Sequence, residues 1–477
     1  MQKSAPNVLL IMTDQHRFDL MNCAGNAFVK TPNIDRIARR GVRFTNAYCG
    51  YPVCLASRSA MLTGLYAHTT GAVNNTDTLD WRYRTMAHHF ADQGYLSGLV
   101  GKMHFNDACK HGYEFYASIN DWLMSLGPKA RMYADEIANH QLSPHFGETV
   151  YDDGAGFPDY DCRWKDGISP WRGQVAKFAE GRVASAMDED DHLDRFVARE
   201  CARFLERYRN QPFFLTASFM KPHTPFYPPA RHAAMYPVGE MPLKDPGDLS
   251  IYPQAARNLA KQYQHASPLQ QRAARAGYYG NLAFVDECVG MLCNSLEGLG
   301  LLDNTIVVYT SDHGEMDGDH GLYQKFCLFE PSVKVPMIFS WPGKLPQNAV
   351  CSDPVSQVGL YPTLAELSGT GPAACTPRAR MDNPPCGLEV ESFAESIINP
   401  GSGRDRGIFV EYGLKNPGHA QRMVRCGPWK CVVHETGEGE LYNLENDPDE
   451  MRNLYEKPEC MEARKRGEAA IGEWIGH

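Results

Sequence analysis

Short hydrophobic runs recur along the chain, and each stops abruptly at polar, ionisable residues. Four of them are apolar, β-branched or aromatic, as in strands that are buried on both faces. Helical patterns separate these runs, so the alternation predicts an α/β fold with a doubly wound, mostly parallel sheet. The predicted strands span residues 7–12, 95–100, 212–219 and 305–310, and the predicted helices span residues 32–40, 194–207 and 276–297, with Gly41 and Gly298 as stops.

The pattern changes near residue 370. Residues 371–385 are rich in Pro, Ala and Gly and are expected to form a loop. We therefore predict a larger α/β domain at residues 1–370 and a smaller C-terminal α+β subdomain, a short antiparallel sheet plus a helix, at residues 371–477. Within the subdomain the expected elements are strands at 407–412 and 423–434, a turn at 442–448 and a terminal helix at 458–474.

Residues 109–187 show no clear period and are rich in Gly, Asp, Tyr and Trp. We expect long loops there, over the edge of the sheet where specificity usually lies.

Composition and charge narrow the class of protein. The chain has 477 residues, more than one core normally serves, and a net charge of -10. There is no basic stripe, so we expect no nucleic acid partner, and no apolar stretch is long enough to cross a membrane. The 15 cysteines are odd in number and form no C-x-x-C pair. We expect reduced thiols and, without a visible signal peptide, a cytoplasmic protein, with a leader trimmed from the N-terminus as the alternative.

Ionisable residues follow all four predicted strands. Asp14 and Gln15 follow the first strand, and Asp312 and His313 follow the fourth. In an open α/β sheet, ligands bind outside the carboxyl ends of the strands. Carboxylate and amide oxygens suit a hard cation such as calcium, while the imidazole admits manganese or magnesium as rivals. The four residues are therefore candidate ligands of one divalent metal, and a helix cap at Asp14 with an ordinary turn after the fourth strand is the alternative.

One short segment points to a particular chemistry. Residues 54–58 read C-L-A-S-R, and L-T-G follows at 62–64. This resembles the signature of the sulfatase family, C-x-P/A-S-R, in which the cysteine is oxidised to formylglycine. The resemblance implies that one hydroxyl of the hydrated aldehyde attacks the sulfur of a sulfate ester, and that the other expels sulfate. A buried structural thiol is the alternative for Cys54.

The resemblance extends over nearly the whole length. The chain has G-K-x-H at 101–104, K-P-H-x-P at 221–225, G-L-Y-Q-K at 321–325 and E-L-Y-N-L-x-x-D-P at 440–448. It implies an alkaline-phosphatase-like fold and a role for each matching residue. Arg58 would hold the formylglycine and Lys102 would bind sulfate. His104 would contact the diol, and His223 would contact sulfate and the leaving oxygen. Lys325 would hold sulfate or protonate the leaving group.

The resemblance also makes Cys54 a metal ligand, through a diol hydroxyl. It places a polar sulfate contact near Asn74 and Asn75 without deciding between them. Ala56 departs from the proline of most members, which leaves open which maturase modifies the site. The pair Gln15 and His313 also occurs in phosphonate monoester hydrolases, relatives on the same fold.

The sequence thus predicts a sulfuric ester hydrolase that uses formylglycine and a divalent metal. The expected substrates are sulfate monoesters, of sugars by default, as small molecules or oligosaccharides. Trp164, Trp171 and Arg172 are candidates for contacts with the sugar, and packing within a loop or core is the alternative. A formylglycine-generating maturase acting on Cys54 is the implied partner, and the sequence carries no signal for an oligomeric state. The alternatives are a phosphonate monoester or phosphodiester hydrolase with the same machinery, and a silent relative that binds an anion with Cys54 unmodified.

Overall fold

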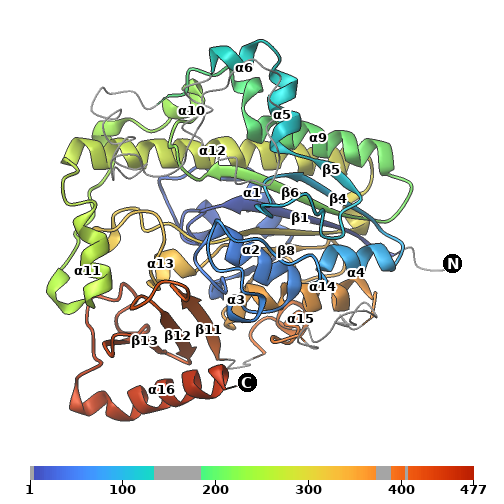
Figure 1. Ribbon diagram of the computed structural model, residues 1–477. Coiled ribbons are helices and arrows are strands. Elements are labelled where there is room, and N and C mark those ends of the chain that lie inside the picture. The colour runs from blue at the N-terminus through green and yellow to red at the C-terminus, as the bar shows by residue number, and fades with distance from the viewer. Residues whose placement is uncertain (1–4, 134–183, 372–387, 403–406, 477) are drawn as a thin grey trace.

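The computed structural model describes residues 5–133, 184–371, 388–402 and 407–476. At its centre is an eight-stranded sheet in the order β5-β4-β6-β1-β7-β8-β2-β9 (Figure 1). The strands from β5 to β7 run parallel, and β8 is antiparallel to both of its neighbours. The predicted doubly wound, mostly parallel sheet is therefore confirmed. The strand bounds are β1 Asn7–Asp14, β2 Gly41–Phe44, β4 Leu96–Gly101, β5 Phe115–Ala117, β6 Phe213–Pro222, β7 Thr305–Ser311, β8 Met337–Ser340 and β9 Ala349–Cys351.

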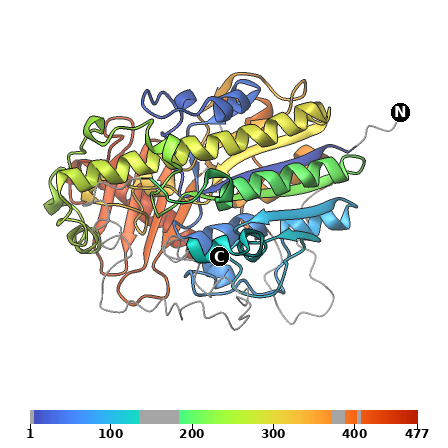
Figure 2. The same ribbon diagram turned by 90° about the horizontal axis from the view of Figure 1, so that it is seen from above.

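Helices cover both faces of this sheet. On one face, α9 (Leu193–Tyr208) and α12 (Pro268–Gly298) run side by side, as Figure 2 shows, together with α1 (Pro32–Arg39). On the other face lie α2 (Cys54–Thr63), α4 (Met86–Asp92) and α14 (Leu360–Ser368).

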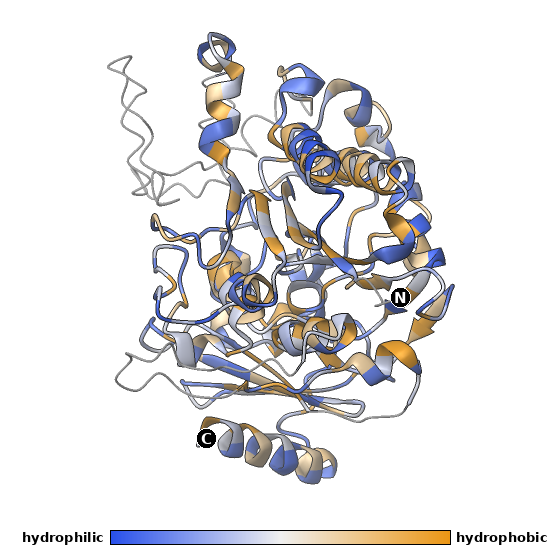
Figure 3. Cartoon of the chain, turned by 90° about the vertical axis from the view of Figure 1, so that its right-hand side faces the viewer, coloured by the Kyte–Doolittle hydropathy of each residue, from blue (hydrophilic) through white to orange (hydrophobic). Residues whose placement is uncertain are grey.

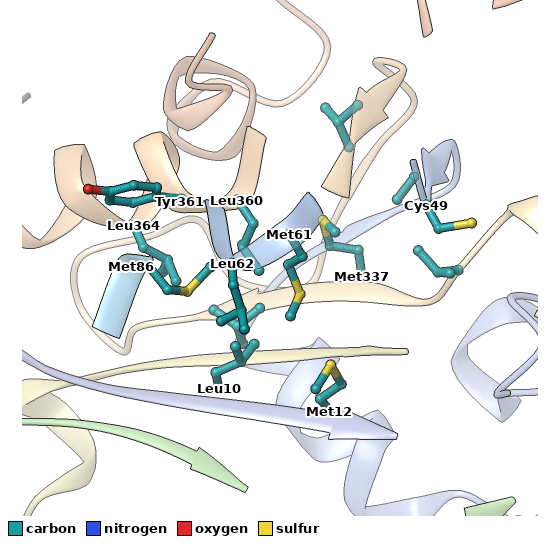
Figure 4. Close-up of a cluster of buried hydrophobic side chains, with 14 of the residues drawn as sticks. Leu10, Met12, Cys49, Met61, Leu62, Met86, Met337, Leu360, Tyr361 and Leu364 are labelled. Carbon is teal, nitrogen blue, oxygen red and sulfur yellow. The ribbon is translucent and has the colours of Figure 1, made fainter. Parts of the chain in front are cut away.

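Side chains of strand β1 pack against the helices on both faces of the sheet. Leu10 and Met12 belong to the core on the α2 side, and Leu9 and Ile11 belong to the core on the α12 side. Successive side chains of a strand point to opposite faces, so a strand that is apolar throughout must be covered twice. Figure 4 shows Met61 and Leu62 of α2 above Leu10 and Met12. This packing fixes α2, and with it Cys54, over the central strands.

The remaining elements complete the first part of the chain. β3 (Ala47–Tyr48) and β10 (Val355–Ser356) form a two-stranded parallel pair. The other α-helices are α3 Ala67–Thr70, α5 Ile119–Leu126, α6 Lys129–Met132, α10 Ala230–Ala233, α11 Gln254–Lys261, α13 Glu330–Val333 and α15 Ala394–Ile398. In the described residues, no helix is both long enough and apolar enough to span a bilayer.

The C-terminal part is a four-stranded antiparallel sheet with one long helix. Its strands follow in the order β11 (Ile408–Tyr412), β12 (Gln421–Cys426), β13 (Trp429–His434) and β14 (Gly439–Asn443). Helix α16 (Met461–Ile475) lies against one side of this sheet, with hydrophilic residues along much of its length (Figure 3). The predicted antiparallel sheet plus helix is confirmed, while the domain boundary at residue 370 stays a prediction.

Buried ion pairs tie this part to the first. The Lys430 ammonium of β13 lies 3.0 Å from Glu330 of α13 and 2.6 Å from Glu450. Glu450 also accepts a hydrogen bond from the Glu330 backbone N–H at 2.6 Å. Separating the two parts would leave buried charges without partners, which is energetically costly. These contacts therefore hold the C-terminal part in one position against the first.

Several element predictions need correction. Residues 115–132, expected as loop, contain β5, α5 and α6. Helix α12 begins at Pro268 rather than at residue 276, because Ser267 and Gln270 form a capping box. Residues 423–434 are not one strand but parts of β12 and β13, joined by a two-residue turn at 427–428.

Smaller differences concern the ends of elements. The first predicted helix ends at Arg39, and Gly41 begins β2 instead of ending that helix. Gly298 is the last residue of α12, and Gly300 is the residue with the left-handed φ of 66°. Strand β14 reaches Asn443, so the turn expected at 442–448 begins later. Most of the loop predicted at 371–385 lies outside the described residues, as do Trp164, Trp171 and Arg172.

Candidate active site

Most residues of the candidate site lie at the carboxyl ends of the parallel strands. Asp14 is the last residue of β1, and Asp312 directly follows β7. Lys102 follows β4, and His223 follows β6. Because β4, β6, β1 and β7 are neighbours in the sheet and run parallel, their carboxyl ends lie at one edge. The chain therefore gathers these residues from positions up to 298 residues apart (14 to 312) at one place.

Cys54 reaches the same place from the other side, as the first residue of α2. Val53 is the extended N-cap of this helix, and Gly64 ends it with a left-handed φ of 71°. The Cys54 side chain is buried, with its sulfur 3.2 Å from His313 Nε2 and 3.8 Å from Asp14 Oδ1. A helix N-terminus carries partial positive charge, which favours an anionic group at this position.

Four of the predicted metal ligands meet here. Ligand atoms of Asp14, Cys54, Asp312 and His313 all lie within 4.8 Å of one another, and all four residues are buried. His313 Nε2 is 3.8 Å from Asp14 Oδ1 and 3.6 Å from Asp312 Oδ1. Two carboxylates and an imidazole are a fitting donor set for a divalent cation.

Gln15, the fifth predicted ligand, borders this group. Its backbone N–H donates to Asp312 Oδ1 at 3.0 Å. Its side-chain Oε1 accepts a hydrogen bond from Lys325 Nζ at 2.7 Å, and its Nε2 donates to Glu315. Gln15 has a left-handed φ of 69°, an uncommon conformation for a residue other than glycine, found where surrounding contacts hold it.

Arg58 lies beneath the group. Its Nε donates to Asp312 Oδ2 at 2.8 Å, and its Nη2 lies 3.2 Å from Asp14 Oδ2. Its Nη1 donates to the Lys102 carbonyl at 2.6 Å and to Ser218 Oγ at 2.8 Å. The guanidinium thus binds the two carboxylates of the candidate metal site and the end of β4. The resemblance had instead implied that Arg58 holds residue 54 itself.

Positive and polar groups surround the Cys54 sulfur. Burial acts to raise the pKa of this thiol, but Lys102, Lys325 and His313 outweigh it and hold the pKa well below its usual range. His104 and His223 also lie beside Cys54, and a negative charge there acts to raise the pKa of each imidazole. The site therefore stabilises negative charge at the position of Cys54.

The charges of these neighbours respond to one another. Burial would lower the pKa of Lys102, yet its ion pair with Asp14 raises it. Asp14 has its pKa lowered by Lys102, His223 and Arg58 in spite of burial, while burial and the nearby Asp14 raise the pKa of Asp312. Burial lowers the pKa of both His104 and His223, so both are neutral near pH 7 in this state.

The structure separates the two candidate asparagines. Asn75 Oδ1 accepts the Leu55 backbone N–H at 3.2 Å, and the Asn75 carbonyl lies 3.1 Å from His104 Nε2. The Asn74 backbone N–H instead donates to Asp77 at 2.8 Å. Asn75 is therefore the one that lines the start of α2.

Three further polar residues were missed in the sequence. Ser57 donates to the Asp312 carbonyl at 2.5 Å, and Ser218 accepts a bond from Arg58. Glu315, fully buried, contacts Gln15. Glu315 lies three residues after Asp312, at the same strand end, and this position could have identified it from the sequence. Ser218 lies inside an apolar strand, where no sequence pattern marks it.

Comparisons with known proteins agree with this picture. The family model described as Sulfatase matches residues 6–370. The chain is 28% identical to an arylsulfatase of Clostridium perfringens, over 96% of this chain and 92% of that protein. It is 24% identical to an N-acetylglucosamine-6-O-sulfatase of Bacteroides thetaiotaomicron, over 96% of this chain and 84% of that protein. The crystal structure of a phosphonate monoester hydrolase of Agrobacterium radiobacter shares the fold, with a TM-score of 0.76, 24% identity and coverage of 99% and 95% of the two chains.

Proposed function

The chain belongs to the sulfatase family, and on this premise we propose that it is a formylglycine-dependent hydrolase of sulfate monoesters in which Cys54 is the modified residue. The observation that carries the proposal is the surroundings of Cys54. Its sulfur lies at the start of α2, 3.2 Å from His313, next to the carboxylate of Asp14 and among cations that lower its pKa. A structural thiol needs none of these neighbours, whereas a nucleophile that attacks an anion needs fixed positive charge.

Formylglycine at position 54, once hydrated, would supply one hydroxyl to attack sulfur while the ester oxygen leaves with a proton. Loss of the proton from the second hydroxyl would then expel sulfate and restore the aldehyde. A bound divalent ion supplies positive charge that polarises the reacting oxygens. Asp14, Gln15, Asp312 and His313 would hold this ion, together with residue 54. Calcium is the first candidate because carboxylate and amide oxygens dominate the set, and manganese or magnesium are rivals because of the imidazole.

The other groups act on the sulfate and its leaving oxygen. Lys102 is held by Asp14 and keeps its positive charge beside residue 54, where it would bind a sulfate oxygen. His104 lies beside Cys54, with its Nε2 3.1 Å from the Asn75 carbonyl, which suits a contact with one diol hydroxyl.

His223 and Lys325 are the candidates for protonating the leaving oxygen. The two lie near Cys54. Burial is the largest cause of the lowered pKa of His223, and the positive charge of Lys325 is the second. A bound sulfate ester adds negative charge, which favours the protonated imidazole. His223 is therefore assigned as the general acid, with Lys325 as a sulfate contact.

The segment around Cys54 bears on its maturation. Residues 54–58 are all buried in the folded chain, and Ser57 and Arg58 are bonded to Asp312. A maturase must reach the Cys54 side chain, which is buried once the chain has folded. The proposed formylglycine-generating partner therefore acts before this region has folded.

Sulfate monoesters of sugars are the proposed substrates, as small molecules or oligosaccharides. The support is the likeness to a relative that is named for a sugar sulfate, N-acetylglucosamine-6-O-sulfate. The arylsulfatase among the relatives makes aryl sulfates a second class to test. Phosphonate monoesters and phosphodiesters are the alternative, because the same nucleophile and cations suit them.

A panel of substrates tests the proposal. Values of kcat/KM are measured for sulfated monosaccharides, 4-nitrophenyl sulfate and a phenyl phosphonate monoester, with Cys54→Ala as the blank. We expect turnover of sulfate esters that the blank lacks, with a sugar sulfate preferred. A preference for the phosphonate over every sulfate would make the alternative correct. No turnover by protein that is fully modified at position 54 and loaded with metal would refute both.

A further inference from the structure

Glu315 is a buried carboxylate that no step above uses. It lies three residues beyond Asp312, and its Oε1 accepts backbone N–H groups of Asp317 at 2.9 Å and Gln324 at 2.5 Å. Its Oε2 accepts a hydrogen bond from Gln15 Nε2. All three bonds point toward the carboxylate, so each of them needs an acceptor at position 315.

The Gln15 amide is held from two sides by groups of opposite kind. The Glu315 carboxylate can only accept, and the Lys325 ammonium can only donate. The amide therefore has one orientation that satisfies both, with Nε2 toward Glu315 and Oε1 toward Lys325, 2.7 Å away. In this orientation an oxygen, not an NH₂ group, is presented on the side of Lys325.

Glu315 also holds the backbone that carries Lys325. Gln324, the residue before Lys325, donates its N–H to Glu315, and both Gln324 and Phe326 have left-handed φ values, 66° and 80°. Such residues are strained and persist only where the surroundings fix them. One carboxylate thus contacts both the candidate metal ligand Gln15 and the loop of Lys325.

We propose that Glu315 is a positioning residue that orients the Gln15 amide oxygen as a metal ligand and fixes Lys325 beside residue 54. This inference rests on the proposed function, which assigns Gln15 to the metal. Glu315 touches neither substrate nor metal in this account. It acts by fixing which atom of Gln15 faces the site.

Exchanging the two side chains tests the orientation directly. Glu315→Gln keeps an oxygen for the two backbone N–H groups but turns an NH₂ toward Gln15. The Gln15 amide must then rotate and present its own NH₂ to Lys325 and the metal, where it repels both. In the double variant Glu315→Gln/Gln15→Glu, the carboxylate at position 15 accepts from the introduced amide and again offers an oxygen on the other side. The total charge of the pair is unchanged.

Calcium affinity of the metal-depleted protein, titrated by calorimetry, is the first readout, and kcat with 4-nitrophenyl sulfate is the second. Groups that orient metal ligands typically change metal affinity 10–100-fold. We expect Glu315→Gln to weaken Ca²⁺ binding at least about tenfold and the double variant to return to within about threefold of wild type. Glu440→Gln is the matched control: Glu440 is also buried, and accepts bonds from His434 and Tyr442 in the C-terminal sheet. It should leave Ca²⁺ affinity unchanged.

Equal Ca²⁺ affinity of wild type and Glu315→Gln would overturn the inference, and so would a wild type that binds no divalent ion. If Glu315→Gln does not fold, the double variant decides alone: restored folding and binding support the exchange, and an unfolded or non-binding protein contradicts it. These outcomes are independent of turnover. A wild type that binds metal but hydrolyses no ester would contradict the proposed function. It would not affect the conclusion drawn from the Ca²⁺ affinities of the Glu315 variants.

Discussion

Arg58 Nε lies 2.8 Å from Asp312 Oδ2, and the same guanidinium reaches Asp14, so one buried cation joins the carboxyl ends of β1 and β7. Both carboxylates belong to the candidate metal site, and both are fully buried. Between two like charges at short distance, a fixed guanidinium reduces their repulsion before any metal arrives. Arg58 is thereby part of the framework of the site.

Arg58→Ala should lower the free energy of unfolding by about 3–5 kcal/mol, the usual cost of leaving buried charges without their partner. Arg58→Lys should recover only part of this, since an ammonium cannot reproduce the fork of four bonds. Urea unfolding with a chelator present measures both. Arg82→Ala removes an exposed pair with Asp80 and is the control, with no measurable change expected. Equal midpoints for Arg58→Ala and Arg82→Ala would contradict this role.

The metal should stabilise the folded protein measurably. Calcium at about 100 times its Kd should add about 2.7 kcal/mol, since it binds only the folded site. Chelation should remove activity, and Asp312→Asn should abolish both the activity and the shift in melting temperature that calcium causes. Asp286→Asn is the matched control, because Asp286 is buried and accepts the backbone N–H groups of Asn33 and Ile34 away from the site. A full calcium shift in Asp312→Asn would show that the metal binds elsewhere.

The role of His223 can be separated from simple sulfate binding by the leaving group. A sugar alkoxide leaves poorly and needs a proton, and general acid catalysis contributes roughly 10²–10⁴-fold to such steps. Nitrophenolate leaves without one. His223→Ala should therefore reduce kcat on a sugar sulfate by about that factor and reduce kcat on 4-nitrophenyl sulfate far less. Equal losses on both substrates would mean that His223 only binds sulfate.

Part of this structure could be predicted because it depends on patterns within short segments of the sequence. Apolar runs that end in ionisable residues marked the four central strands, and their parallel order placed Asp14, Lys102, His223 and Asp312 at one edge. Helix α12 began earlier than predicted because its first turns are polar, although Ser267 and Gln270 carry a capping signal. The β12–β13 hairpin was missed because its turn has only two residues. With apolar residues before and after the turn, the segment was interpreted as one continuous strand.

Contacts between residues far apart in the chain could not be predicted from the sequence. The resemblance assigned Arg58 to residue 54, four positions earlier in the chain, while its observed partner Asp312 is 254 residues away. The choice between Asn74 and Asn75 likewise depended on how the loop meets His104. Such contacts are set by the packing of whole elements, and a local pattern does not contain them.

Acid should destabilise the protein in part through His320. Burial lowers the pKa of this histidine from 6.5 to about 4, and its Nδ1 lies 2.7 Å from Tyr252 Oη. Below pH 6.5 the unfolded chain takes up a proton that the folded chain refuses until about pH 4, so stability falls as pH falls through this window. The contribution is at most about 3 kcal/mol. His320→Asn, which suits the left-handed φ of 55°, should flatten stability against pH between 6.5 and 4. An unchanged slope would contradict this assignment.

The most direct test is the mass of the peptide that contains Cys54. Trypsin should release residues 44–58, which also include Cys49, so the peptide carries its own unmodified thiol for comparison. In active protein we expect a loss of about 18 Da at position 54 and alkylation of Cys49 alone, since an aldehyde does not take the label. Cys54→Ala should fold normally and turn over no ester. Full activity in Cys54→Ala, or active wild-type protein in which both cysteines are alkylated, would contradict the account.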